Sequence, residues 1–309
     1  MKVICGIKKF PKKFHHAVLV IGVFDGLHQG HQELIRRAVQ RARAIQRPIV
    51  VMTFDPHPVN VLHPEVRLPL IVSLPYRLKL IEALGVDAAV VISFTKIFSQ
   101  LNPENFIKQY LVESIQPQEV FVGDDFRFGQ GRIGTIDLFK EVSERFGFRV
   151  NTVHPIKRKG AGIKISSTTI RQFISDGKLA QAQRLLGRRV SVMGRVVKGD
   201  RRGRLLGFPT ANILPHDVIL PPIGVYAVYV DVDGRGYHGM ANIGRRPSFE
   251  HDGQILLEAH IFHFHQDLYD KNIIVEFVRK IRDEKIFVSR QKLTSQLQKD
   301  QKRVERILQ

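Results

Sequence analysis

The sequence predicts an α/β protein with an N-terminal parallel-sheet domain at residues 1–186 and a C-terminal antiparallel β domain at residues 187–309. In the first half, short apolar segments alternate with segments whose apolar residues recur at helical spacing, which is typical of parallel strands joined by crossover helices. In the second half, short segments of alternating pattern are separated by turns rich in Gly, Pro and Asp, which is typical of an antiparallel barrel or sandwich. A length of 309 residues suits two domains of ordinary size.

The elements of the first half follow from apolar periodicity and from the residues that interrupt it. Leu34, Ile35 and Ala38 recur at helical spacing, and Pro48 follows that helix. Strands are expected at 17–23, 49–54, 88–94 and 119–123, and helices at 30–46, 76–84 and 102–114. Ligands of such sheets bind at the carboxyl ends of the strands, so a site is expected at that edge.

The elements of the second half are mostly strands. After a helix expected at 168–186, strands are expected at 190–198, 224–232, 237–243, 255–262 and 271–281. An amphipathic helix is expected at 289–307. The change of pattern places the domain boundary near Gly187.

The charge of the chain is strongly positive. Lys and Arg number 48 and Asp and Glu 29, which gives a formal net charge of +19. Such a charge favours an anionic partner, for example nucleotide phosphates, and is equally consistent with a solvated basic surface. No zinc-finger spacing and no RNA-binding signature accompanies the charge, so nucleic acid is not expected as a partner.

Composition excludes several classes of protein. The single cysteine, Cys5, excludes an internal disulfide and a four-thiolate metal site. The longest apolar stretch, from Ala17 to Phe24, has about eight residues, whereas a membrane helix needs about twenty. The basic N-terminus lacks the apolar core of a signal peptide. We therefore expect a cytoplasmic protein with no membrane partner, and self-association is left open.

A segment rich in glycine and histidine follows the first predicted strand and opens the first predicted helix. It reads Gly22-Val23-Phe24-Asp25-Gly26-Leu27-His28-Gln29-Gly30-His31. Its glycines allow a tight turn close to a ligand, and the free N–H groups of a helix N-terminus favour phosphate. His28 and His31 face the same way on a helix, where two imidazoles can donate hydrogen bonds to phosphate oxygens, although a histidine there can also be a simple cap. The candidate ATP-binding residues are Gly22, Phe24, Asp25, Gly26, His28, Gly30 and His31.

This segment resembles the His-x-Gly-His motif of nucleotidyltransferases, which transfer a nucleotidyl group from ATP and release pyrophosphate. Residues 165–171, which read Ile-Ser-Ser-Thr-Thr-Ile-Arg, are similar to the second signature of these enzymes. Hydroxyl groups at a helix start and an Arg guanidinium suit phosphate oxygens. In-line attack of one phosphate on the α-phosphorus of ATP needs no protein nucleophile, so His28, His31 and Arg171 are expected to stabilise the transition state. The second signature adds Ser166, Ser167, Thr168 and Arg171 to the ATP-binding candidates.

Two further segments, at the ends of the second and fourth predicted strands, point to the acceptor. They are 54–58, Phe-Asp-Pro-His-Pro, and 122–129, Val-Gly-Asp-Asp-Phe-Arg-Phe-Gly. Aromatic and proline-rich walls suit a flat ring, although loop turns and core aromatics give the same pattern. Both segments resemble the flavin-site motifs of the bacterial FMN adenylyltransferase domain, and this resemblance implies FMN as the acceptor. The flavin-binding candidates that it implies are Phe54, Pro56, His57, Pro58, Asp125, Phe126 and Phe128.

A basic glycine-rich loop in the second half is a separate candidate site. Gly199, Gly203 and Gly207 recur at a spacing of four, and their N–H groups suit phosphates. The loop lacks Gly-Lys-Ser/Thr, so it is not a Walker A motif. The Thr210 hydroxyl and the Asn212 amide, which follow, are hard oxygen donors suited to Mg²⁺ that bridges ATP phosphates. The ATP-binding candidates here are Gly199, Gly203, Arg204, Gly207, Pro209, Thr210 and Asn212, with Thr210 and Asn212 as the metal ligands.

This loop resembles the riboflavin kinase signature of the bifunctional bacterial FAD synthetases, and so do residues 222–226, 241–249 and 257–260. Ser248 stands where the family usually has Thr, which keeps a hydroxyl group. The resemblance implies that Glu258 is the general base that takes the proton of the riboflavin 5′-hydroxyl. A strand carboxylate beside Mg²⁺-bound phosphate is chemically suited to that role.

Together the resemblances cover nearly the whole chain, in the order of that family. They imply a Rossmann-like FMN adenylyltransferase domain followed by a riboflavin kinase β-barrel with a terminal helix. The implied reactions are phosphorylation of riboflavin to FMN by Mg-ATP, then transfer of AMP from a second ATP to FMN, which yields FAD and pyrophosphate. The implied small-molecule partners are therefore riboflavin, FMN, FAD and ATP.

Other interpretations remain open at this point. One module alone could be active, the N-terminal domain could serve another phosphate-bearing acceptor, or the chain could be a basic nucleic-acid-binding regulator. Five histidines raise the question of a zinc site, but no acidic or thiolate partner stands at ligand spacing, so zinc is not expected. These histidines are His238, His251, His260, His263 and His265.

Overall fold

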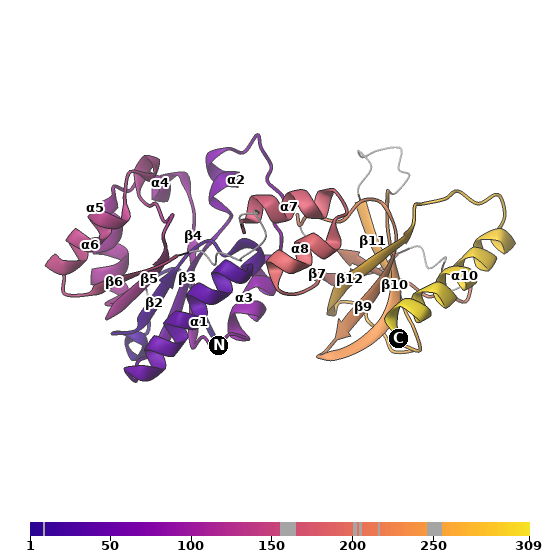
Figure 1. Ribbon diagram of the computed structural model, residues 1–309, viewed down its shortest axis with the longest axis horizontal. Coiled ribbons are helices and arrows are strands. Elements are labelled where there is room, and N and C mark those ends of the chain that lie inside the picture. The colour runs from indigo at the N-terminus through magenta and orange to yellow at the C-terminus, as the bar shows by residue number, and fades with distance from the viewer. Residues whose placement is uncertain (9, 155–164, 200–202, 204–205, 216, 246–254) are drawn as a thin grey trace. The chain divides into compact units, whose positions relative to one another are not determined.

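The computed structural model describes residues 1–8, 10–154, 165–199, 203, 206–215, 217–245 and 255–309. Contacts divide the chain into two compact units (Figure 1). The first unit comprises Met1–Leu70 and Leu74–Ser166, and the second comprises Ile71–Ser73 and Ser167–Gln309.

A six-stranded parallel sheet in the order β1-β4-β3-β2-β5-β6 forms the centre of the first unit (Figure 1). From β2 the chain continues to β3 and β4 on one side, and later to β5 and β6 on the other side. The carboxyl end of β2 is therefore a topological switch point, where open parallel sheets bind ligands. The strands are β1 (Lys2–Cys5), β2 (Val18–Ile21), β3 (Ile49–Asp55), β4 (Ala88–Ser93), β5 (Glu119–Gly123) and β6 (Arg149–Val153).

Helices cover both faces of this sheet, because successive residues of the strands alternate between two apolar clusters. Val18 and Val20 are buried on the side of α1 and α3, whereas Leu19 and Ile21 are buried on the side of the π-helical segment and α6. Two short helices, α2 and α4, follow the carboxyl ends of β3 and β4. The helical elements are α1 (Gln29–Ala44), α2 (Pro58–Leu62), α3 (Leu74–Glu82), α4 (Lys96–Ser99), α5 (Pro103–Phe106), the π-helical segment Ile107–Ile115 and α6 (Ile136–Arg145).

A closed antiparallel barrel in the order β10-β11-β8-β7-β12-β9 forms the centre of the second unit (Figure 1). Its strands are β7 (Val190–Val197), β8 (Ala211–Leu214), β9 (Gly224–Val232), β10 (Arg235–Arg245), β11 (Ile255–Ile261) and β12 (Asn272–Arg282). Helices α7 (Ser167–Ser175) and α8 (Leu179–Leu186) precede the barrel, and α8 packs on β7 and β12.

The last helix, α10 (Arg290–Leu308), packs on β9, β10 and β12. Asp300 on α10 is buried, and its carboxylate accepts hydrogen bonds of 2.8 Å from Arg282 Nε and from Gln296 Nε2. Since a buried charge is costly without a partner, this pair fixes the helix against the end of β12.

The predicted fold class is confirmed: a parallel sheet with crossover helices is followed by an antiparallel barrel and a terminal helix. The prediction of one helix at 168–186 is wrong, because Gly177 adopts a φ of +72° and separates α7 from α8. The strands β1, β6 and β8 and the helices α2, α4 and α6 were not predicted; the three strands are only four or five residues long. Contacts group α7 and α8 with the barrel. The boundary near Gly187 stays a prediction.

Candidate active sites

The imidazoles of His28 and His31 stack at the N-terminus of α1, with ring centroids 3.6 Å apart and an angle of 16° between the planes. His28 is the N-cap of the helix, and its Nδ1 accepts a hydrogen bond of 3.3 Å from the backbone N–H of His31. An accepting Nδ1 places the proton of a neutral imidazole on Nε2. His28 therefore caps the helix through Nδ1 and carries the proton of its neutral form on Nε2.

The surroundings of His31 favour a neutral imidazole. Its Nδ1 is buried and has no hydrogen-bond partner among the described residues, and the Phe24 ring packs edge-on against it at 5.3 Å between centroids. Desolvation lowers the pKa of His31 well below its ordinary value of 6.5, and the positive potentials of His28 and Arg77 lower it further. At neutral pH, His31 therefore acts as an uncharged hydrogen-bonding group.

Buried side chains fix the turn between β2 and α1. Phe24 is fully buried at a φ of +56°, and Asp25 is 2% exposed at the start of the 3-10 turn Asp25–Leu27. A positive φ at a bulky residue is unfavourable, and the packing of the ring offsets this cost. Of the glycine candidates, Gly22 follows β2, Gly26 lies in the turn and Gly30 lies in the first turn of α1.

Arg77 is a residue of this site that the sequence analysis did not single out. It lies on α3, it is 1% exposed, and its guanidinium donates to the backbone oxygens of Val23 and Phe54. A basic residue in an amphipathic helix normally faces solvent, so a buried arginine was not expected here. The available signal was its place four residues before Ile81, which is fully buried.

The flavin candidates of two strand ends belong to one aromatic cluster. Successive ring centroids lie 5.9 Å apart for Phe54 and Phe98, 6.1 Å apart for Phe98 and Phe106, and 5.7 Å apart for Phe106 and Phe128. The ring of Phe126 stacks on Phe128 at 5.5 Å. The cluster thus connects residues at the ends of β3 and β5, the two strands that flank β2.

The other flavin candidates lie around α2 and in the turn after β5. His57 is the N-cap of α2, where its Nδ1 accepts a hydrogen bond of 3.2 Å from the N–H of Val59, and Pro58 is the first residue of the helix. A cis peptide bond precedes Pro56, and Asp125 is exposed. Several further rings of the aromatic cluster were not predicted, among them those of Phe94, Phe98, Phe106 and Tyr110.

The residues of the second nucleotidyltransferase signature lie at the start of α7. Ser166 directly precedes the helix, Ser167 and Thr168 are its first two residues, and Arg171 is 9% exposed. By its contacts α7 belongs to the second unit, whereas His28 and the other residues of the first motif belong to the first unit. Their joint action therefore remains a proposal.

In the barrel, strand register aligns three polar side chains. Glu258 on β11 is paired with Asn212 on β8 and with Asn242 on β10. Directly paired residues project to the same face of a sheet, so these three side chains share one face. Their neighbours Ala241 and Ala259 are buried on the opposite face, which is the barrel interior. A half-buried row of amide, carboxylate and amide groups therefore lies on the outside of the barrel.

The glycine-rich loop passes closely over the predicted metal ligands. A Cβ on Gly199 would lie 2.2 Å from Asn212 Nδ2, and a Cβ on Gly203 would lie 3.3 Å from Thr210 Oγ1. Only a glycine at position 199 allows this approach without displacing the amide. Of the other loop candidates, Gly207 and Pro209 are exposed, and Arg204 lies outside the described residues.

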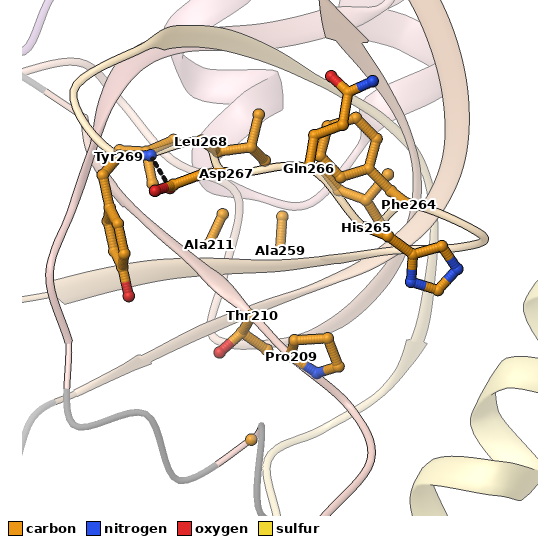
Figure 2. A pocket seen from close by; sticks show the side chains of 13 residues that line it. Pro209, Thr210, Ala211, Ala259, Phe264, His265, Gln266, Asp267, Leu268 and Tyr269 are labelled. Atoms are coloured by element: carbon orange, nitrogen blue, oxygen red, sulfur yellow. Dashed lines mark hydrogen bonds between the residues drawn. The ribbon is translucent and has the colours of Figure 1, made fainter.

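A cavity of about 400 Å³ opens beside Thr210 (Figure 2). The side chains of Ala211 and Ala259 point toward the segment 264–269, which forms the opposite wall, and within it the Tyr269 N–H donates to the Asp267 carboxylate at 2.9 Å (Figure 2). Pockets of this volume take small-molecule ligands. This wall was not predicted, because residues 264–269 carry no recognisable motif.

His260 anchors the segment that carries Thr210. Its Nδ1 lies 2.7 Å from the Pro209 carbonyl oxygen, and since a carbonyl only accepts, Nδ1 is the donor. Burial lowers the pKa of His260, and this hydrogen bond opposes the shift. Within the described ranges, no three His, Cys, Asp or Glu residues are grouped to hold a metal ion.

The donor set of the barrel fits a hard cation that protein and substrate hold jointly. Thr210, Asn212 and Glu258 offer hydroxyl, amide and carboxylate oxygens around the same loop. Mg²⁺ typically takes one or two protein ligands and completes its coordination with phosphate oxygens and water. The set therefore fits Mg²⁺ in company with ATP.

Comparisons with known proteins find relatives of both halves of the chain. Residues 10–169 match the family model described as FAD synthetase, and residues 186–308 match the model described as riboflavin kinase. A bifunctional riboflavin kinase/FMN adenylyltransferase of Buchnera aphidicola subsp. Schizaphis graminum is 37% identical over 302 residues, which cover 97% of this chain and 96% of that protein. The protein of that name in Escherichia coli K12 is 36% identical over 303 residues, with the same coverage. The chain belongs to the bifunctional riboflavin kinase/FMN adenylyltransferase family.

One solved structure matches this chain along nearly its whole length. A crystal structure from Streptococcus pneumoniae, described as a macrolide-efflux protein, matches with a TM-score of 0.83 and 34% identity and covers 99% of both chains. Among the residues that the structure describes, no helix is long and apolar enough to cross a membrane.

We expect the imidazole of His31 to remain neutral at pH 6.5, where half of an exposed imidazole is charged, because burial disfavours the cation. An NMR titration of the ring C–H resonances, assigned by comparison with His31→Asn, measures this. The pKa of His31 is lower in the folded than in the unfolded protein. Its contribution to the free energy of unfolding is therefore complete above about pH 6.5 and is lost as the pH falls toward the folded pKa. A titration midpoint at or above pH 6.5 would contradict the inferred burial.

Proposed function

We propose that this chain makes FAD from riboflavin in two ATP-dependent steps at two separate sites, with a division near Gly187. The barrel phosphorylates riboflavin to FMN, and the parallel-sheet domain transfers AMP from a second ATP to FMN and releases pyrophosphate. One observation carries the proposal. In a chain of this family, a stacked histidine pair lies at the switch point of the sheet, and a paired glutamate and asparagine lie on the barrel.

In the kinase reaction, Glu258 takes the proton of the riboflavin 5′-hydroxyl while that oxygen attacks the γ-phosphorus of ATP. The bond between the γ-phosphorus and the bridging oxygen breaks, and ADP leaves. We assign the nucleoside of ATP to the cavity beside Thr210 and its phosphates to the loop at 199–207, including Arg204. When bound by Thr210 and Asn212, Mg²⁺ would neutralise charge on the phosphates.

In the adenylyltransferase reaction, a phosphate oxygen of FMN attacks the α-phosphorus of ATP, and the bond to the pyrophosphate leaving group breaks. His28 offers an Nε2–H donor at the switch point, and we assign it, His31 and Arg171 to the stabilisation of charge in the transition state. The serine and threonine hydroxyls at the start of α7 are assigned to ATP phosphates. The isoalloxazine ring of FMN is assigned to the aromatic cluster around Phe54 and Phe128.

Both reactions bring polyanions to the protein, so the net charge of +19 has a use in attracting its substrates. A cytoplasmic location fits an enzyme that consumes ATP twice. Self-association is open in this scheme, because neither proposed reaction requires a second copy of the chain.

The direct test is chromatography of flavins after incubation of the purified protein with riboflavin, ATP and Mg²⁺, sampled over time. FMN should appear first and FAD later, and chelation of Mg²⁺ should stop the formation of FMN. A reaction that ends at FMN would refute the adenylyltransferase half. Failure to convert either riboflavin or added FMN would refute both halves.

Glu258→Gln should lower the rate of FMN formation by about 10²- to 10⁴-fold, because the substitution removes the base but keeps the shape of the side chain. The same variant should convert supplied FMN to FAD at the normal rate. Separate assays with riboflavin and with FMN measure the two steps, and a riboflavin kinase rate within twofold of the unaltered protein would exclude the role of Glu258.

The double variant His28→Ala with His31→Ala should show the reverse behaviour. Loss of the two imidazoles should lower FAD formation from FMN by at least about 10²-fold, the effect typical of one transition-state donor. Riboflavin should still be phosphorylated, so FMN should accumulate. If a folded double variant also lost kinase activity, the independence of the two sites would be wrong.

A further inference from the structure

The guanidinium of Arg77 is a buried charge that the two proposed reactions leave without a role. Its side chain is 2% exposed, on a helix that packs on one face of the parallel sheet. A desolvated cation is costly, so its position must be supported by specific partners. Within the described residues Nε of Arg77 is buried without a hydrogen-bond partner, so the two terminal nitrogens Nη1 and Nη2 make these contacts.

Those partners lie on two neighbouring strand ends. Nη1 of Arg77 donates to the Val23 oxygen at 2.6 Å, and Nη2 donates to the Phe54 oxygen at 3.3 Å and to the Asp55 carboxylate at 3.4 Å. The Val23 oxygen also accepts a hydrogen bond of 2.9 Å from Thr53 Oγ1. Because the guanidinium is a rigid planar fork, these bonds fix the distance between the two backbone segments.

Each of these backbone segments leads directly into a predicted half of the site. Val23 precedes the buried turn that presents His28, and Phe54 precedes the segment from Pro56 to Pro58. The first segment carries ATP candidates and the second carries flavin candidates. A side chain that ties the two segments together therefore controls the separation of the two substrates.

Charge supports the same arrangement. The carboxylates of Asp25 and Asp55 stabilise the cation and oppose the effect of burial, which lowers the pKa of Arg77. Asp25 is itself 2% exposed, so this region holds a compensated pair of buried charges. The imidazoles of His28 and His31 are the other titratable groups in this network, and Arg77 contributes to the lowered pKa of His31.

We propose that Arg77 is a positioning residue for adenylyl transfer, whose guanidinium holds the turn at Val23 and the segment at Phe54 at the spacing that ATP and FMN require. The inference rests on the proposed function of the parallel-sheet domain. It assigns Arg77 no contact with either substrate. A purely structural role would affect unfolding but would leave the Michaelis constants of a folded variant unchanged.

The test compares Arg77→Lys and Arg77→Met with the matched control Arg43→Met. Arg43 also donates to a backbone oxygen, that of Gly85, and to a carboxylate, that of Asp87, but its side chain is 59% exposed. FAD formation from FMN and ATP gives kcat and KM, and thermal unfolding monitors the fold. Phosphorylation of riboflavin by the same samples reports on the barrel.

Arg77→Lys keeps the charge but loses the fork, so the KM for both ATP and FMN should rise by at least about tenfold, the loss expected for one charge-assisted hydrogen bond. Arg77→Met should lower kcat/KM by at least about a hundredfold and move the titration midpoint of His31 to higher pH. Riboflavin phosphorylation should stay unchanged in all variants, and Arg43→Met should form FAD at the normal rate.

Unchanged KM values in folded Arg77→Lys would overturn the proposal, and this variant decides the question if Arg77→Met does not fold. A loss of FAD formation that only follows the loss of folded protein, with normal KM values and an unmoved His31 midpoint in the folded fraction, would equally assign Arg77 to stability alone. If the unaltered protein forms no FAD from FMN, the proposed function itself fails, which is a distinct result.

Discussion

Strand pairing is the constraint on which both candidate sites depend. In the first unit, parallel pairing of β2 with β3 and β5 brings three segments that are far apart in sequence to one edge of the sheet. In the second unit, antiparallel register aligns Asn212, Glu258 and Asn242 on one face of the barrel. A slip of one residue would turn Glu258 into the barrel interior and would remove it from the asparagines.

The parts of the structure that depend on contiguous residues could be predicted from the sequence. The apolar strands of the sheet, α1 and the turn with His28 and His31 are each specified within about twenty residues, because local periodicity and spacing express them directly. The stacking of these two imidazoles follows from their separation by three residues on one helical turn. The resemblance to known families added what spacing alone left open, namely the identity of the acceptor.

The parts that depend on distant residues could not be predicted in this way. The alignment of Glu258 with Asn212 depends on the register between β8 and β11. The strand β8 was itself not predicted, because it is short and directly follows the glycine-rich loop in the sequence. Arg77 was hidden for a different reason. Its charge indicates an exposed residue, whereas the carbonyl oxygens at two strand ends and the carboxylates of Asp25 and Asp55 explain why burial is tolerated there. Likewise, the cavity wall at 264–269 is assembled by a turn without a motif.

The two sites differ in their charged groups in a way that matches the proton demands of the proposed reactions. A hydroxyl acceptor must lose a proton before or during attack, so a carboxylate near the phosphates is useful, and a cation is needed to keep that carboxylate compatible with ATP. A phosphate monoester acceptor is already an anion and needs no base. Hydrogen-bond donors are then sufficient for the chemical step, because a neutral His31 lies beside the Nε2–H of His28 and no carboxylate has to act as a base. In the proposed scheme, oxygen ligands on the barrel and imidazoles on the sheet both act on ATP, and the two sets of groups differ because the acceptors differ in charge.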